Sequence, residues 1–417
     1  MTRSRDKTRH PVLRSAAIAT LILAAGAWAY AEFVYSPVIF GLRDDFVQAV
    51  PNQTVPEGLT SLSAESCGAC HREIYDEWRT SIHSQAYVDP YFQAYWQKDG
   101  HIWICANCHT PLQNQQPLIV TGLKGDKIQH PLTEPNPMFD PALQREGITC
   151  AGCHVRDGVV YGPYADSQAP HPTAYDPRYR TTEICYWCHQ VPSGPFQFYN
   201  GGPCATFLEF EDGPYARQGF TCQTCHMPPV TRPAAHGGPE RDTRRHLWRG
   251  GHFPDMLNQA LEVKLSGPDG GFQAGDDATF GLRLTNGGAG HKIPTGDPDR
   301  HFTITFEEMQ DGKVVESKRH TIGRWLIWKP VIIELYENRI PPTEFRDYRY
   351  TAQTGPGRQL RVTVTYHIVT ERAKGRLIRK YDLPPDTVDH FTLFEQTVDL
   401  GAPDAAANAA ARPDTAS

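Results

Sequence analysis

The sequence contains five copies of the pattern Cys-x-x-Cys-His, which together use ten of its eleven cysteines. This pattern is the attachment signature of c-type haem, because two thiols can bond to the vinyl groups of one haem while the next histidine binds its iron. We therefore predict five covalently bound c-type haems with their iron. The motif cysteines are Cys67, Cys70, Cys105, Cys108, Cys150, Cys153, Cys185, Cys188, Cys222 and Cys225, and the motif histidines are His71, His109, His154, His189 and His226.

Two other chemistries also use paired cysteines. Zinc ribbons contain Cys-x-x-Cys pairs, but they do not need a histidine after every second cysteine. A thioredoxin-like redox pair normally occurs once in a chain. Five copies that all end in histidine favour haem over zinc or disulfide use. The remaining cysteine, Cys204, is interpreted as a small buried apolar residue rather than a ligand.

Each haem iron needs a second axial ligand or an open position, and the composition points to histidine as that ligand. The chain has 18 histidines but only five methionines, including Met1, so ligation by methionine throughout is excluded. Ligation by two histidines gives lower potentials than ligation by histidine and methionine. The candidates read from the residues alone are His83, His171, His246 and His252.

The position of His83 indicates which haem it can bind. It lies 12 residues after His71, which is about 18 Å along a straight helix. Two ligands of one iron face each other at a much shorter distance, so we expect His83 to bind a haem other than that of its own motif. The paired glycines before His252 would let the backbone approach a flat ring closely. The alternative for every candidate is an ordinary surface histidine.

Short helices should position these motifs. Residues 73–86 have the apolar spacing of a helix whose inward face carries Ile74, Trp78 and Ile82. Elsewhere the region is rich in proline and glycine, so we expect short helices at each motif, joined by loops. One haem for each stretch of about 40 residues leaves too little protein to separate the haems. We therefore expect neighbouring haems to lie close together, as a chain for electron hopping.

After Cys225 the sequence has no further cysteines and shows the alternating patterns of strands. Strands are predicted at 261–265, 278–284, 302–307, 313–316, 360–369 and 391–398, and Asp311-Gly312 is a good hairpin turn. The predicted class is α+β, with a mostly helical and irregular multihaem domain followed by an antiparallel β-sandwich-like domain. The predicted division is 1–45 for a signal peptide or membrane anchor, 46–60 for a linker, 61–255 for the pentahaem domain, 256–400 for the β-domain and 401–417 for a disordered tail.

The N-terminus predicts export. Five basic residues precede an uncharged run from Ser15 to Ala31, as in a signal peptide, and Ala29-Tyr30-Ala31 resembles a cleavage site. Alternatively, residues 15–42 could span a bilayer, which needs about 20 residues; we favour this uncleaved anchor. Either segment would place the remainder on the periplasmic side of the inner membrane. The formal charge of −6 offers no basic surface for nucleic acid.

Three segments resemble the cytochrome c-554 type (cytochrome c-552/4 domain) multihaem family. They are Cys67-Gly-Ala-Cys-His-Arg-Glu-Ile-Tyr-Asp-Glu-Trp-Arg-Thr-Ser-Ile-His83, Cys222-Gln-Thr-Cys-His-Met-Pro228 and Gly290-His-Lys-Ile-Pro-Thr-Gly296 with the following Asp-Pro-Asp-Arg300. The resemblance implies a periplasmic or surface electron carrier with closely stacked haems. It also implies that His83 and His291 are axial ligands and that one haem can be five-coordinate.

Three functions are compatible with these features. The first is electron transfer between a membrane donor, either a redox protein or a quinol-linked complex, and a periplasmic or external acceptor; the haems carry the chemistry and no catalytic side chain is needed. The second is an oxidoreductase acting on nitrite, hydroxylamine or a related small molecule at one open haem. Pentahaem nitrite reductases typically carry one Cys-x-x-Cys-Lys motif, whereas all five motifs here end in histidine. The third is a subunit of a larger conduit that docks through the β-domain.

Overall fold

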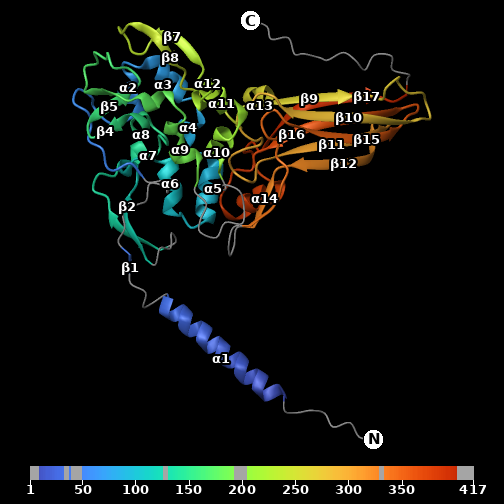
Figure 1. The fold of residues 1–417 in the computed structure, drawn as a ribbon, viewed down its shortest axis with the longest axis horizontal. Coiled ribbons are helices and arrows are strands. Elements are labelled where there is room, and N and C mark those ends of the chain that lie inside the picture. Colours follow the sequence, from blue (N-terminus) through green and yellow to red (C-terminus); the bar gives the residue numbers. More distant parts are fainter. Residues whose placement is uncertain are drawn as a thin grey trace.

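The computed structural model describes residues 9–31, 37–38, 49–124, 130–191, 204–327 and 333–401. These residues form a body of short helices and loops, a neighbouring lobe of long strands, and one isolated helix that points away from both (Figure 1). The predicted mixed α+β class is confirmed. The predicted disordered tail and the N-terminal part of the predicted signal or anchor segment lie largely outside the described residues.

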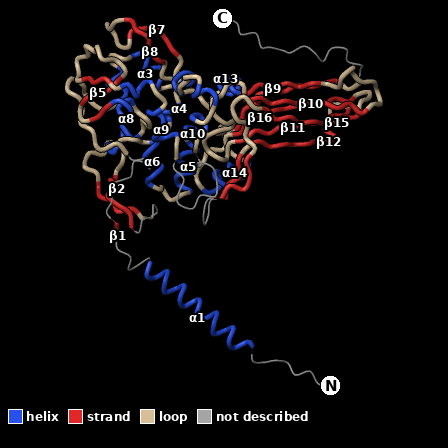
Figure 2. The backbone as a smooth tube through the Cα atoms, viewed as in Figure 1, coloured by secondary structure: helices blue, strands red, loops and turns tan. Residues whose placement is uncertain are grey.

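The body consists of short elements connected by irregular segments (Figure 2). Its longest described helix, α5, has 9 residues. The helices are α2 (Ala64–Gly68), α3 (Arg72–Trp78), α4 (Ile82–Gln85), α5 (Pro90–Lys98), α6 (Trp103–His109), α7 (Pro141–Gln144), α8 (Cys150–His154), α9 (Glu183–His189), α10 (Thr206–Glu211), α11 (Pro214–Arg217) and α12 (Cys222–His226). The strands are β1 (Pro37–Val38), β2 (Leu118–Lys124), β3 (Pro131–Pro135), β4 (Val155–Arg156), β5 (Val159–Gly162), β6 (Thr173–Tyr175), β7 (Pro229–Pro233) and β8 (Glu240–Arg244).

The prediction of a single helix over 73–86 is wrong, because the structure has two helices in this segment. Helix α3 ends at Trp78, and Ser81 begins α4 by accepting a hydrogen bond from the backbone N–H of Ser84. A serine at this position caps a helix, which favours a new start over a continuous helix. The division turns the chain between His71 and His83.

The lobe contains two antiparallel sheets with a common core. One sheet has the order β15 (Phe345–Gln353), β10 (Asp277–Asn286), β9 (Leu261–Ser266). The other has the order β12 (Lys313–Ile322), β11 (His301–Gln310), β16 (Arg358–His367), β17 (His390–Asp399). Alternate side chains of β10, β11 and β16 are buried, and Phe306 of β11 stacks on Tyr350 of β15 at 5.3 Å. The two sheets therefore pack face to face.

Each strand predicted after Cys225 overlaps an observed one. The expected hairpin at Asp311-Gly312 joins β11 to β12, and both residues have positive φ angles, as such a turn requires. The sequence did not indicate strand β15, the hairpin of β13 (Arg324–Ile327) and β14 (Ile333–Glu337), or the helices α13 (Pro254–Ala260) and α14 (Glu371–Lys380).

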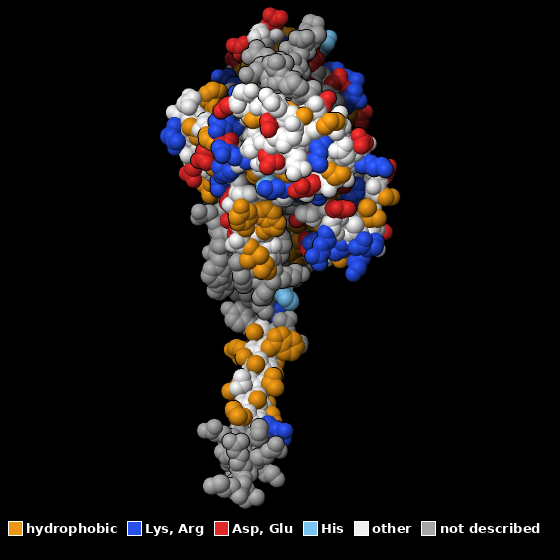
Figure 3. Space-filling view, turned by 90° about the vertical axis from the view of Figure 1, so that its right-hand side faces the viewer, with side chains coloured by type: hydrophobic (Ala, Val, Ile, Leu, Met, Phe, Trp, Pro, Cys, Tyr) orange, Lys and Arg blue, Asp and Glu red, His pale blue; other side chains and the backbone are white. Residues whose placement is uncertain are grey.

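The isolated helix is α1 (Arg9–Ala29), and Figure 3 shows its hydrophobic side chains on the visible face. Among the residues that the structure describes, no helix has both the length and the apolar character needed to cross a membrane. Part of the predicted 15–42 span lies outside those residues.

Candidate haem centres

Four of the five motifs end a short helix of the body. Helices α6, α8, α9 and α12 each terminate at their motif histidine. The first motif is divided, since Cys67 lies in α2 and His71 begins α3. Residues three apart on a helix share one face, so in these four motifs the cysteine pair is presented on one side of its helix, with the histidine directly after it.

Backbone carbonyls orient most of the motif histidines. A carbonyl can only accept a hydrogen bond, so the Nδ1 atom that it contacts must carry the proton, and Nε2 is left with a free lone pair. Metal-binding histidines are typically held in this way. The Nδ1 contacts are His71 to Ala234 at 2.8 Å, His109 to Ala86 at 2.6 Å, His154 to Tyr161 at 2.7 Å and His226 to Arg249 at 2.6 Å.

Three motif histidines face a second histidine from elsewhere in the chain. The ring centroids are 6.4 Å apart for His83 and His189, 6.5 Å for His154 and His246, and 6.3 Å for His226 and His291. A metal–imidazole bond of about 2 Å on each side of an iron, plus about 1.1 Å from each nitrogen to its ring centre, gives about 6.2 Å. The spacing of each pair therefore fits one iron between the rings.

The surroundings of these rings keep them neutral. Desolvation lowers the pKa of His189, and it lowers the pKa of His83 to about 3. The neutral ring is the form that binds a metal. His189 is nevertheless exposed by its accessible surface.

The other two motif histidines have different surroundings. Among the described residues, neither His71 nor His109 faces a second histidine ring at such a separation. His109 instead stacks directly on Phe92, with 3.8 Å between the ring centroids. The described part of the chain thus leaves two motifs without an opposed histidine.

Two further histidines named from the sequence are not opposed to a motif histidine. The Nδ1 atom of His171 lies 3.4 Å from the neighbouring Pro172 carbonyl. The Nε2 atom of His252 accepts a hydrogen bond of 3.2 Å from Arg300. Since this uses the lone pair that an iron would need, His252 is engaged elsewhere in this structure.

Thiols of different motifs lie in contact. The thiols of Cys67 and Cys150, of Cys108 and Cys188, and of Cys185 and Cys222 are close enough to shift each other's pKa. The first and third, second and fourth, and fourth and fifth motifs are therefore neighbours. The eleventh cysteine, Cys204, is partly buried, and desolvation raises the pKa of its thiol to about 12.

An acidic residue that the sequence did not single out holds the loop of His246. The buried carboxylate of Glu77 accepts hydrogen bonds from the His246 backbone N–H at 2.9 Å and from Arg232 at 2.6 and 2.8 Å. The pKa of Glu77 is lowered, because these hydrogen bonds outweigh the desolvation that acts in the opposite direction. No local pattern distinguishes this glutamate from an exposed one.

A second network holds the loop of His291. Arg339 contacts Glu209 of the body at 2.6 Å and Glu337 at 2.5 Å, and it donates to the Pro294 carbonyl. In the same loop, a side chain at Gly290 would collide with the ring of Phe210, since its Cβ would lie 2.8 Å away. Glycine at this position lets the lobe approach the body closely enough to place His291 opposite His226.

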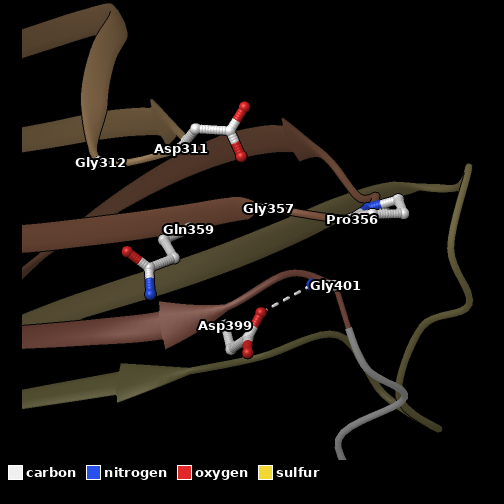
Figure 4. Close-up of a pocket in the computed structure, with 7 residues that line it drawn as sticks. All are labelled: Asp311, Gly312, Pro356, Gly357, Gln359, Asp399 and Gly401. Atoms are coloured by element: carbon white, nitrogen blue, oxygen red, sulfur yellow. Dashed lines mark hydrogen bonds between the residues drawn. The ribbon is translucent and has the colours of Figure 1, made fainter.

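A separate depression lies at the far end of the lobe. It has a volume of about 490 Å³ and is lined by the turns at Asp311, Gly357 and Gly401 (Figure 4). The backbone N–H of Gly401 donates to Asp399 at 2.8 Å. Strand β11 runs from the body to this end, so the depression is a full strand length from the motifs.

Comparison with solved structures gives a match over most of the chain. No protein-family model matches the chain, and no curated protein does. The solved structure of a penta-heme cytochrome c552 from Thermochromatium tepidum aligns with 81% of this chain and 98% of its own, at 19% identity and a TM-score of 0.60. A CARDB domain from Pyrococcus furiosus covers 32% of this chain and 84% of its own, at 15% identity and a TM-score of only 0.16. The chain therefore shares its fold with a penta-heme cytochrome c552.

Proposed function

We propose that this protein is a five-haem c-type cytochrome that transfers electrons through closely spaced haems. The observation that carries the proposal is the separation of 6.3 to 6.5 Å in three histidine pairs, each containing one motif histidine. Haem supplies reversible one-electron chemistry, while the protein sets the position and potential of each haem. The fold shared with a penta-heme cytochrome supports the same role.

The axial pairs are assigned from the opposed rings. His189 and His83 bind the fourth haem, His154 and His246 the third, and His226 and His291 the fifth. Each pair joins distant segments of the chain, so ligation also ties the body together. The fifth pair fastens the lobe to the body. Ligation by two histidines places these three haems at low potential.

The neighbouring motifs support a connected path for electrons. The first motif adjoins the third through Cys67 and Cys150, and the third adjoins the fourth through Cys153 and Cys188. The fourth motif also adjoins the second and the fifth. A haem held by the fourth motif would therefore lie next to three others, and a donor and an acceptor would use different ends of the chain.

The donor is a redox protein or a quinol-linked complex of the inner membrane, and the acceptor is periplasmic or external. This location follows from the basic and then apolar N-terminal segment, which acts as a signal peptide or as an anchor. Covalent attachment of haem on the periplasmic side of the membrane is consistent with both.

A second function is reduction of nitrite, oxidation of hydroxylamine or related chemistry at an open iron. The observation that favours it is the lack of an opposed histidine at His71 and His109 among the described residues. An iron with one free position can bind a small molecule, whereas an iron with two histidine ligands cannot.

Two measurements test these functions. Mass spectrometry and a pyridine haemochromogen assay of the native protein should give five covalently bound haems. A mass equal to that of the bare polypeptide would exclude both functions. Electron paramagnetic resonance should show at least three low-spin haems. A high-spin signal that changes on adding cyanide or nitrite would favour the enzyme, and five low-spin haems would favour the carrier alone.

A further inference from the structure

The guanidinium of Arg300 makes few direct contacts within the described part of the chain. The residue follows the loop of His291 and immediately precedes β11, at the junction of lobe and body. Its Nε atom is buried and has no hydrogen-bond partner. Its contacts are the Thr295 carbonyl at 3.3 Å and His252 at 3.2 Å, and no described carboxylate forms an ion pair with it. Desolvation lowers the pKa of Arg300, but the negative groups around it outweigh that effect and raise the pKa.

The nearby carboxylates are engaged elsewhere. Asp89 accepts a hydrogen bond of 2.8 Å from the backbone of Phe92, as the cap of helix α5. Asp297 accepts one of 2.8 Å from the backbone of Asp299. Both carboxylates interact with Arg300 electrostatically, without a hydrogen bond to it. The guanidinium of Arg300 therefore still has N–H donors that no described acceptor uses.

Two glycines shape the surroundings of this side chain. A Cβ at Gly296 would lie 2.9 Å from Nη1 of Arg300, and a Cβ at Gly251 would collide with the hydroxyl of Tyr366. Glycine at both positions brings two loops close to the guanidinium and keeps the Tyr366 hydroxyl beside it. His252 accepts a hydrogen bond from Nη2 of Arg300 and so orients the guanidinium.

The site adjoins a cavity. His252 also lines a cavity of about 340 Å³ at the junction, together with Asp89, Tyr91, Ile368 and residues at the start of β17.

We propose that Arg300, oriented by His252 and assisted by the Tyr366 hydroxyl, binds a carboxylate or a small oxyanion at the junction of lobe and body. The planar fork of arginine matches two oxygens of such a group and forms strong charge-assisted hydrogen bonds. One source is a propionate of one of the proposed haems. The other is a free oxyanion such as nitrite. The inference rests on the proposed haem binding.

The test uses the full-length holoprotein and the variants R300Q, R300K and R283Q. Arg283 is an exposed arginine of β10 paired with Asp347 and serves as the control. A pyridine haemochromogen assay first counts the haems of each variant, so a failure of haem binding itself is recognised separately. Spectroelectrochemical titration then gives the five midpoint potentials, with and without added nitrite.

A haem propionate at the site predicts that R300Q shifts one midpoint potential to a more negative value, because a fixed positive charge near the haem is lost. R300K should shift it less, R283Q should not shift it, and nitrite should have the same effect on wild type and R300Q. A free oxyanion predicts a nitrite-dependent shift in the wild type that R300Q abolishes. If R300Q matches the wild type both in its potentials and in its response to nitrite, the proposal is overturned.

If neither Arg300 variant retains five haems, Y366F is measured in the same way. Removal of its hydroxyl should produce a smaller change of the same sign as that described for R300Q. Potentials and nitrite response identical to those of the wild type would then overturn the proposal.

Discussion

The buried ion pair between the two parts of the molecule should control both stability and the fifth haem. Arg339 belongs to the lobe and is 4% exposed, while its partner Glu209 belongs to helix α10 of the body and is 8% exposed. Arg339 also binds Glu337 and the carbonyl of Pro294, three residues after His291. We consider the substitution R339M, which keeps an unbranched apolar side chain and removes the charge and the donors.

The expected loss is large because the remaining groups cannot reach water. Removing one partner of a buried ion pair costs about 3–5 kcal/mol, since it leaves the other charge uncompensated. Here Glu209 and Glu337 both lose hydrogen bonds, so we expect R339M at the upper end of this range. The double variant E209Q/R339M should be less destabilised than the sum of its single variants, because it leaves no unpaired carboxylate at position 209.

Denaturant unfolding followed by circular dichroism and by Soret absorbance measures both effects. R339M should lower the free energy of unfolding, and the haem bound by His226 should become partly high-spin as the loop of His291 loosens. The exposed pair of Arg283 and Asp347 is the matched control, and R283M should unfold like the wild type. If R339M unfolds at the same denaturant concentration as R283M, the network does not hold lobe and body together and the reasoning is refuted.

Three further outcomes follow from the site. The double variant C222A/C225A should lose one haem by mass, whereas C204A should keep all five. If the two variants carry the same number of haems, Cys204 is not the one cysteine outside haem attachment. The variant H291M should raise the midpoint potential of one haem, because ligation by histidine and methionine gives higher potentials than ligation by two histidines; unchanged potentials would remove His291 from the ligand set. The variant W78A should lower the free energy of unfolding by about 3–5 kcal/mol, since Trp78 is buried and donates to the Ile148 carbonyl; a loss below about 0.5 kcal/mol, the usual effect of a surface substitution, would show that this contact is not part of the core.

Local patterns determined what could be predicted from the sequence. The motifs, the strands of the lobe and the turn at Asp311-Gly312 each depend on residues within a few positions of one another. The break at Ser81 is also local, but the apolar spacing of 73–86 concealed it. The hairpin of β13 and β14 carries no comparable signal, because its apolar side chains are largely exposed.

The second histidine of each pair could not be assigned to a haem from the sequence, because such pairing depends on the tertiary fold. His83 was expected to bind a haem other than its own, and the structure places it opposite His189. His246 and His252 share one short segment, yet only His246 faces a motif histidine. His252 faces Arg300 instead, and Arg300 itself lies distant in the chain. A spacing rule along the sequence cannot distinguish these two histidines.

The distribution of core residues explains why the lobe and the body depend on different forces. In the described part of the body, one buried apolar cluster contains only Leu62, Leu112, Leu143, Ala151 and Val155. The main cluster lies chiefly between the two sheets of the lobe, with a few side chains of α5 added. Since apolar burial is the principal stabilising term in folding, the lobe has a core of its own, whereas the body needs the proposed haems to supply one. The proposed ligation by His291 and the ion pairs of Arg339 then act at the same loop. The lobe, which has its own apolar core, would therefore hold one iron ligand in place for the body, which lacks a comparable core.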